Sequence, residues 1–236
     1  MTSGTAESNL TLNFTGFPEA GMHFLRDLAA NNDANWFKPR RDAYEATVRG
    51  PMIALVADLL SLAAARKLPL NGEPEKAVFR VHRDVRCSKD KRPYKTHCGA
   101  SLTRTGTKLA PGLFYIHIEP GACFVGGGFW HTEPPVLDRL RQRILNKPDQ
   151  FLEVIQALDA RDMPLEPDEA AAKRLPRGYE AAKGTPIETF LKHRNLIARF
   201  PLWDADVMAA DLPFLLLDRF AALLPLLEFG WPVVDG

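Results

Sequence analysis

The chain has 236 residues, 46% of them hydrophobic and 25% charged, and its net charge is +1. This composition is typical of a globular chain that needs no disulfide or metal to hold its core, and the near-neutral total argues against a general nucleic-acid binder. The three cysteines have no CxxC spacing, which favours free thiols in a reducing compartment. There is neither a signal-peptide pattern nor an apolar run of roughly 20 residues, so we expect a cytoplasmic protein without a membrane segment.

The first third of the chain is predicted to be helical after a short tail. Residues 1–13 are polar and are expected to form a flexible tail. Apolar residues in 17–33 recur at helical spacing, and 35–67 is expected to form one or two further helices. Pro39 and Pro51 are expected to mark helix starts or a kink, because proline has no amide hydrogen to donate inside a helix.

The middle of the chain changes to the two-residue period of β-strands. Strands are predicted in 76–86, 112–120 and 121–130, and 99–105 is a candidate for a fourth. The Pro-Gly pair at 120–121 predicts a hairpin. Because these runs are short and close together, an antiparallel sheet is favoured over βαβ units.

Helices are predicted again in the last part of the chain. Their ranges are 132–146, 149–159, 187–200 and 204–230. Thr132 is expected to cap the first of them, and Pro213 is expected to interrupt the last. The order of helices, sheet and helices predicts an α+β fold, with a single domain covering 14–230.

Two of the predicted strands combine an apolar face with a polar one. If their apolar sides align in one sheet, their polar side chains share the opposite face. These polar residues are Arg80, His82 and Arg86 on one strand and Tyr115, His117 and Glu119 on the other. Imidazole and carboxylate groups side by side are suited to proton transfer, so His117 and Glu119 are the predicted acid–base pair. The alternative is the ordinary solvated face of an antiparallel sheet.

The stretch RDVRCSKDKRPYKTH, residues 83–97 and called the basic segment below, concentrates positive charge. From Arg80 to His97 the local balance is +5, within a chain total of +1, which leaves −4 for the rest. Guanidinium forks, lysines and hydroxyl groups are suited to bind a phosphate or carboxylate beside aromatic walls. The predicted ligand-binding residues are Arg80, Arg83, Arg86, Ser88, Lys89, Lys91, Tyr94, Lys95, Tyr115, Trp130, Lys173, Arg177 and Tyr179. The alternative is a solvated basic loop.

Lys173 and Arg177 belong to a second basic stretch, 173–186. If it folds beside the basic segment, the two stretches hold an anion from both sides. The alternative is that Lys173 and Arg174 end a helix, where cations are favourable.

Metal and cofactor motifs are missing from the sequence. His82, His97, His117, Glu119 and His131 could supply metal ligands, but there is no HExxH and no CxxC pair. There is also no GxxxxGK[ST], no GxGxxG and no GxSxG. We therefore predict no metal site and identify no cofactor.

The basic segment resembles the signature RDxRFSKDKxPYKT of domain-of-unknown-function family 2461. Other pieces resemble blocks of that family in the same order, so the resemblance spans about residues 14–225. These pieces are NNDANWFKPRRDAYE, GLFYIHIEPGACFVGGGFW, TEPPVLDRLRQRI and KRLPRGYEAAKGTPIETFLKHRNL. The resemblance implies one α+β domain and a cytoplasmic location, and it implies no activity. Cys87 stands where the family usually has Phe, and Gly184-Thr185 replaces the usual His before Pro186.

Three hypotheses about function follow. The first is binding or turnover of a phosphorylated or other anionic small molecule. The second is a nucleic-acid or protein interaction module, with Tyr94 and Trp130 stacking on bases. The third is a purely architectural motif in which Asp84 and Asp90 pair with the neighbouring arginines and lysines. The sequence names no reaction and no oligomeric state.

Overall fold

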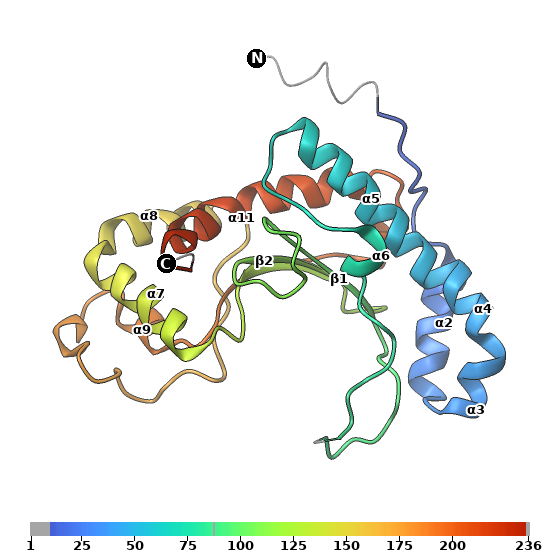
Figure 1. Cartoon of the computed structure of the whole chain (residues 1–236), viewed down its shortest axis with the longest axis horizontal. Helices are drawn as coiled ribbons and strands as arrows, with labels where there is room; N and C mark the ends of the chain where they lie inside the picture. Colours follow the sequence, from blue (N-terminus) through green and yellow to red (C-terminus); the bar gives the residue numbers. More distant parts are fainter. Residues whose placement is uncertain (1–9, 87, 235–236) are drawn as a thin grey trace. The chain divides into compact units, whose positions relative to one another are not determined.

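The computed structural model describes residues 10–86 and 88–234. N-terminal helices precede a central sheet, and further helices follow it, so the predicted α+β fold is confirmed (Figure 1). Most of the predicted tail, and Cys87, lie outside the described residues. Near the start of the described residues, the backbone amides of Asn13 and Phe14 donate hydrogen bonds to the buried Asp58 carboxylate. The shortest of these bonds is 2.8 Å.

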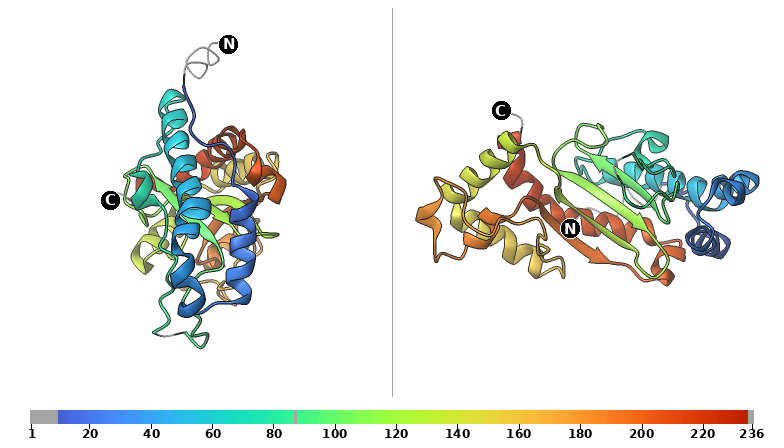
Figure 2. Two further views of the ribbon diagram at one scale, coloured as in Figure 1. Left: turned by 90° about the vertical axis from the view of Figure 1, so that its right-hand side faces the viewer. Right: turned by 90° about the horizontal axis from the view of Figure 1, so that it is seen from below.

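The sheet has four strands in the order β1-β2-β3-β4. They are β1 (Cys98–Thr103), β2 (Leu113–Ile118), β3 (Phe124–Phe129) and β4 (Leu196–Pro201). Figure 2 shows the strands side by side. The predicted hairpin at 120–121 joins β2 to β3, and Gly121 takes a φ of 81°, a left-handed conformation that glycine adopts without steric cost.

Two sequence predictions about this sheet are wrong. Residues 76–86 form no regular strand, because the short helix α6 (Pro74–Ala77) ends within them and only isolated bridges follow, from Val78 to Ala100 and from His82 to Tyr94. Residues 187–200 are not one helix. Helix α9 (Glu188–Lys192) ends at His193, whose backbone is extended, and β4 follows.

The chain forms two compact units. The first comprises Met1–Lys108, Tyr115–Val125 and Pro201–Asp218, and the second comprises Leu109–Phe114, Gly126–Phe200 and Arg219–Gly236. Each unit contributes to the sheet. The single domain predicted for residues 14–230 stays a prediction.

Besides α6, the first unit contains the helices α2 (Glu19–Ala30), α3 (Ala34–Phe37), α4 (Arg41–Tyr44), α5 (Gly50–Ala65) and α10 (Asp204–Met208). A 3-10 turn, Lys38–Arg40, joins α3 to α4, and a π-helical turn, Glu45–Arg49, joins α4 to α5. Pro51 explains the wider turn, because without an amide hydrogen it cannot donate to the Thr47 carbonyl. A Cβ atom on Gly21 of α2 would lie 2.1 Å from that carbonyl oxygen, so only glycine permits this close helix approach.

The helical run 34–65 is long and apolar enough, by length and composition alone, to cross a membrane. The core helix of a soluble protein has the same properties. In the structure Met52, Leu55, Leu59 and Leu62 of α5 are fully buried, and α5 packs on β1. The apolar composition of α5 is therefore explained by its place in the core of the first unit.

The second unit contains α7 (Pro134–Asn146), α8 (Pro148–Asp159), α9 and the larger part of α11 (Leu212–Val234). Leu140 and Ile144 of α7 are buried, as its apolar stripe predicts. Thr132 does not cap α7, because Glu133 occupies the N-cap position and makes no side-chain capping bond. Pro213 lies in the first turn of α11, where its missing amide hydrogen is not needed, so the predicted interruption falls just before it.

Candidate functional site

The arginines of the basic segment form ion pairs with its own aspartates. Asp90 pairs with Arg83 at 2.6 Å and with Arg92 at 2.8 Å, and Asp84 pairs with Arg86 at 2.6 Å. Hydrogen bonds from Arg92 and then Arg83 hold the pKa of the Asp90 carboxyl well below its usual range. These contacts agree with the architectural hypothesis for the loop, because its arginines are already compensated by neighbouring carboxylates.

The other predicted ligand-binding residues of the basic segment differ in their surroundings. Lys89 is exposed, Ser88 is half-buried, and the Lys91 ammonium donates to a backbone carbonyl of the same loop at 2.9 Å. Lys95 turns inward, where its Nζ atom lies 5.0 Å from the centre of the Phe79 ring. Burial lowers the pKa of Lys95. The loop therefore does not gather all its cations around one point.

A cavity of about 730 Å³ lies in the first unit, between the start of the helical run 34–65 and the segment 80–82. We call it the basic cavity. Its walls are Phe37, Lys38, Arg41, Tyr44, Glu45, Arg49, Arg80, Val81, His82 and Tyr94. Arg80 and Tyr94 are the predicted ligand-binding residues among these. The sequence did not predict the wall of the cavity that the helical run forms. Three cationic residues of this wall are Lys38, Arg41 and Arg49.

The basic cavity is strongly positive. Lys38, Arg41, Arg49 and Arg80 contribute cations, and Glu45 is the one carboxylate among its lining residues. Glu45 pairs with Arg49 at 3.5 Å. Within the part of the chain that the structure describes, no carboxylate pairs with Lys38, Arg41 or Arg80. The remaining cations are therefore available to an anionic ligand.

Aromatic rings form one wall of the basic cavity. The Phe37 ring stacks on Tyr94 with centroids 4.3 Å apart and contacts Tyr44 at 5.5 Å. All three side chains are almost fully buried. Burial raises the pKa of the Tyr44 phenol far above its usual value, so this group stays neutral. This aromatic side of the cavity is thus almost fully buried, next to the cationic side.

Asn32 holds Tyr94 in place and was not identified from the sequence. Its side-chain amide donates to the Tyr94 carbonyl at 3.0 Å, and its side-chain oxygen accepts from the Tyr94 amide at 3.0 Å. This two-bond contact connects the end of α2 to the basic segment. The sequence offered one signal for a role of Asn32. It lies in the stretch NNDANWF, which carries part of the family resemblance.

A second constellation, the histidine cluster, consists of His97, His117 and Glu119. His97 directly precedes β1, His117 lies in β2, and Glu119 directly follows β2. The His117 Nε2 atom lies 3.1 Å from Glu119 Oε2, so the predicted acid–base pair is within hydrogen-bonding distance. The rings of His97 and His117 have centroids 4.2 Å apart. Neither His117 nor Glu119 lines the basic cavity.

The histidine cluster is only partly open to solvent. His117 is buried, whereas the Glu119 side chain keeps 35% of its exposure. Burial, and after it the neighbouring His117, lowers the pKa of His97 to about 4. Although burial alone would raise the pKa of Glu119, hydrogen bonds from Thr96 and His117 lower it overall. At neutral pH, His97 is therefore neutral and Glu119 is ionised.

The prediction that Arg80 and His82 share a face with Tyr115 is wrong. It is Phe79 whose ring contacts Tyr115, with centroids 6.1 Å apart, while Arg80 and His82 line the basic cavity. The third predicted member, Arg86, is exposed in the loop. The prediction failed because residues 76–86 are not a regular strand paired with β2.

Four further predicted residues belong to the second unit. Lys173 and Arg177 are exposed, and so is Trp130, at 53%. Tyr179 is buried, and its hydroxyl donates to the Asp138 carboxylate at 2.8 Å, so this side chain already has a structural partner. The predicted convergence of the two basic stretches stays a prediction.

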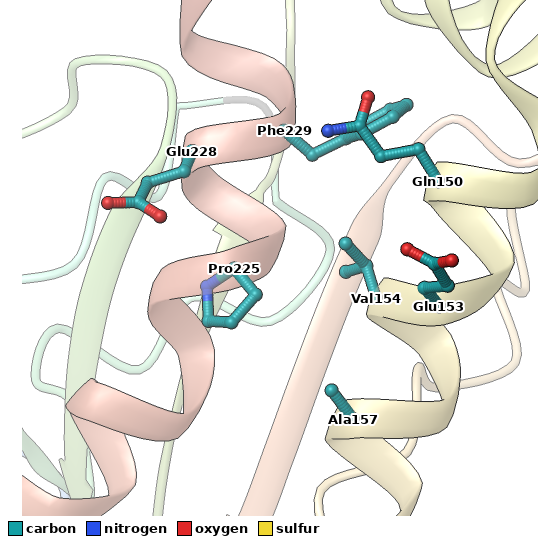
Figure 3. A pocket seen from close by; sticks show the side chains of 7 residues that line it. All are labelled: Gln150, Glu153, Val154, Ala157, Pro225, Glu228 and Phe229. Carbon is teal, nitrogen blue, oxygen red and sulfur yellow. The ribbon is translucent and has the colours of Figure 1, made fainter.

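A smaller cavity of about 310 Å³ lies between α8 and α11 in the second unit. In Figure 3, Val154 and Ala157 face Pro225 across it, and the Glu228 carboxylate points away from α8. Its charged lining residues are Glu153 and Glu228, both acidic. With no cation and few converging polar groups, this cavity is a weaker candidate for a ligand site than the basic cavity.

We expect Cys98 and Cys123 to resist alkylation in the native protein. Both are buried, and burial raises the pKa of each thiol to about 12. At a given pH this lowers the thiolate fraction about a thousandfold. Mass spectrometry of iodoacetamide-treated protein at pH 8 should show slow labelling of both residues, and fast labelling once guanidinium unfolds the chain. Equal rates in the two states would contradict the prediction.

Comparison with known proteins agrees with the resemblance found in the sequence. A family model described as "Conserved hypothetical protein (DUF2461)" matches residues 20–229. This range contains both the basic cavity and the histidine cluster. Searches of curated proteins and of solved structures found no match. The family match covers most of the chain, and the protein therefore belongs to the DUF2461 family.

Proposed function

We propose that the protein binds an anionic small molecule, phosphorylated or carboxylated, in the basic cavity. One observation carries this proposal: four cationic side chains and a single carboxylate surround a cavity of about 730 Å³. Volumes of roughly 300–1,000 Å³ are typical of sites for small molecules and cofactors. Placing several cations around one cavity costs electrostatic free energy, and a bound anion would recover it.

The chemistry of the walls narrows the class of ligand. Arg41 and Arg80 offer planar forks that bind phosphate or carboxylate through two hydrogen bonds, and Lys38 adds a point charge. Phe37, Tyr44 and Tyr94 are almost fully buried, so they give the wall a small apolar surface that suits contact with an uncharged part of the same ligand rather than stacking. The proposed ligand thus combines an acidic group with an uncharged body.

A nucleic-acid interaction module has less support. Stacking on bases requires an accessible ring, but Tyr94 is only 4% exposed and already stacks on Phe37. The arginines of the basic segment are paired with Asp84 and Asp90. We therefore favour a small anion in the cavity over a polyanion on the surface.

Thermal unfolding in the presence of anions tests the proposal. Inorganic phosphate, a sugar phosphate and a nucleoside monophosphate should each be titrated against the wild-type chain, and we expect at least one to raise the melting temperature. Arg41→Ala and Arg80→Ala should weaken the effective affinity by about tenfold or more, because each removes a charge-assisted hydrogen bond.

Arg40→Ala is the matched control. Arg40 neighbours Arg41 but donates to the Trp36 carbonyl and does not line the cavity. This variant should keep the anion-dependent stabilisation. The proposal fails if no anion of the panel stabilises the wild type, or if Arg40→Ala and Arg41→Ala behave alike. Tight binding of an oligonucleotide that weakens steeply with salt would favour the nucleic-acid hypothesis instead.

A further inference from the structure

The histidine cluster brings together donor atoms that are distant in the sequence. One ligand atom each from His97, His117 and Glu119 lies within 4.8 Å of the other two. Two imidazole nitrogens and one carboxylate oxygen are donors that suit Zn²⁺ and other first-row transition-metal dications. We infer that this cluster is a metal-binding site with three protein ligands and an open coordination position.

The closest pair in the cluster already has the spacing of two ligands on one ion. The His117 Nε2 and Glu119 Oε2 atoms are 3.1 Å apart. Two ligands at about 2.1 Å from a metal are roughly 3.0–3.4 Å apart when the angle between them is octahedral or tetrahedral. A metal ion can therefore replace the hydrogen bond between these atoms with little movement of either side chain.

The surrounding hydrogen bonds hold both ligands by their other polar atoms. The Tyr115 hydroxyl lies 3.1 Å from His117 Nδ1, and the Thr96 hydroxyl donates to Glu119 Oε1 at 2.8 Å. Outer contacts of this kind are typical of metal sites, because they orient the ligands and fix the histidine tautomer. For Nε2 to coordinate, the imidazole proton must sit on Nδ1, where the Tyr115 oxygen accepts it.

Packing fixes the orientation of these groups. The Phe124 ring stacks on the His117 imidazole at 4.6 Å, with 16° between the planes. Gly99 leaves room for the Tyr115 hydroxyl, since a Cβ atom there would lie 2.6 Å from it. The histidine cluster is thus held by contacts to several elements of the first unit.

Sequence motifs could not reveal this site. The familiar motif HExxH places its ligands on one turn of a helix, whereas here two ligands lie two residues apart at the end of β2 and the third directly precedes the adjacent strand β1. The absence of such motifs led to the prediction of no metal, and the pairing of β1 with β2 is what unites the three side chains.

Metal binding by the full chain tests the inference. After treatment with EDTA and its removal, titration calorimetry with Zn²⁺ should give a stoichiometry close to one, and Co²⁺ should produce visible d–d absorption bands. His117→Ala and Glu119→Gln should abolish both signals. Glu119→Gln keeps the size of the side chain, so it remains informative if His117→Ala fails to fold, which circular dichroism will show.

Outer contacts supply a finer test. Tyr115→Phe and Thr96→Val should each weaken Zn²⁺ affinity by about 10- to 100-fold, with the stoichiometry unchanged. The control is the exposed pair formed by His23 and Glu19, 3.8 Å apart on one helix. The variants His23→Ala and Glu19→Gln should bind Zn²⁺ like the wild type. The inference is overturned if the wild-type protein binds no metal. It is also overturned if the Glu119→Gln variant binds Zn²⁺ as strongly as the wild-type protein.

Discussion

Replacing Gly128 with alanine is expected to lower the free energy of unfolding by roughly 3 kcal/mol or more. Gly128 lies in β3 with a φ of 134°, a conformation that side chains rarely adopt. A Cβ atom there would also lie 2.0 Å from the Leu196 carbonyl oxygen of the neighbouring strand β4. Backbone strain and overlap therefore act together, and neither can relax without moving one strand from the other. Urea denaturation followed by circular dichroism measures the effect.

Gly121→Ala separates the two causes. Gly121 also has a positive φ, 81°, but nothing lies within 4 Å of a Cβ atom placed there. Only the backbone strain remains in this variant, so we expect its free energy of unfolding to fall by about 1 kcal/mol. If Gly128→Ala costs no more than Gly121→Ala, the close approach between β3 and β4 is not as tight as described.

Asn32→Ala is expected to disturb the basic cavity without touching its lining. The substitution removes both hydrogen bonds to the Tyr94 backbone and leaves a buried amide and carbonyl without this partner. We expect a loss of about 1.5–3 kcal/mol in stability, because each bond contributes roughly 1 kcal/mol and unsatisfied groups add to the cost. The stabilisation by anions should fall as well, since Tyr94 forms part of the aromatic wall.

Asn31→Ala provides the comparison for this variant. Asn31 is the same residue type one position earlier, and its side chain bonds only to the Asp27 carbonyl within its own helix end. The expected change in stability is a few tenths of a kcal/mol, with anion binding intact. Similar losses in the two variants would mean that the contact between Asn32 and Tyr94 does not hold the cavity wall.

The fold class could be predicted from the sequence because its main signals are local. Strands β1, β2 and β3 have strand-forming patterns, and a Pro-Gly turn joins two of them. Strand β4 was missed because its six residues follow a short helix without a turn signal strong enough to separate them. Residues 76–86 alternate like a strand, yet they make only isolated bridges, since alternation does not specify a continuous pairing partner.

The candidate sites were predicted only in part, because they too depend on contacts between distant parts of the chain. Arg80 and Tyr94 were recognised from the charge of their segment, and His117 and Glu119 from their alternation. Lys38, Arg41 and Arg49 look like solvated helix positions, because nothing local indicates which face of a helix borders a cavity. His97 joins the histidine cluster only through strand pairing. The contributions that were missed are those that depend on contacts between distant parts of the chain.

The π-helical turn Glu45–Arg49 links the charge of the basic cavity to the winding of a single helical turn. A π-helical turn contains one residue more than regular α-helical winding requires. If the same number of residues wound as a regular α-helix, the extra residue would rotate the preceding helix by about 100° relative to α5. Lys38 and Arg41 would then turn away from the cavity, while α5 kept its place in the core. The π-helical turn thus absorbs the extra residue locally, and the position of half of the cavity's cationic side chains depends on the winding of this one turn.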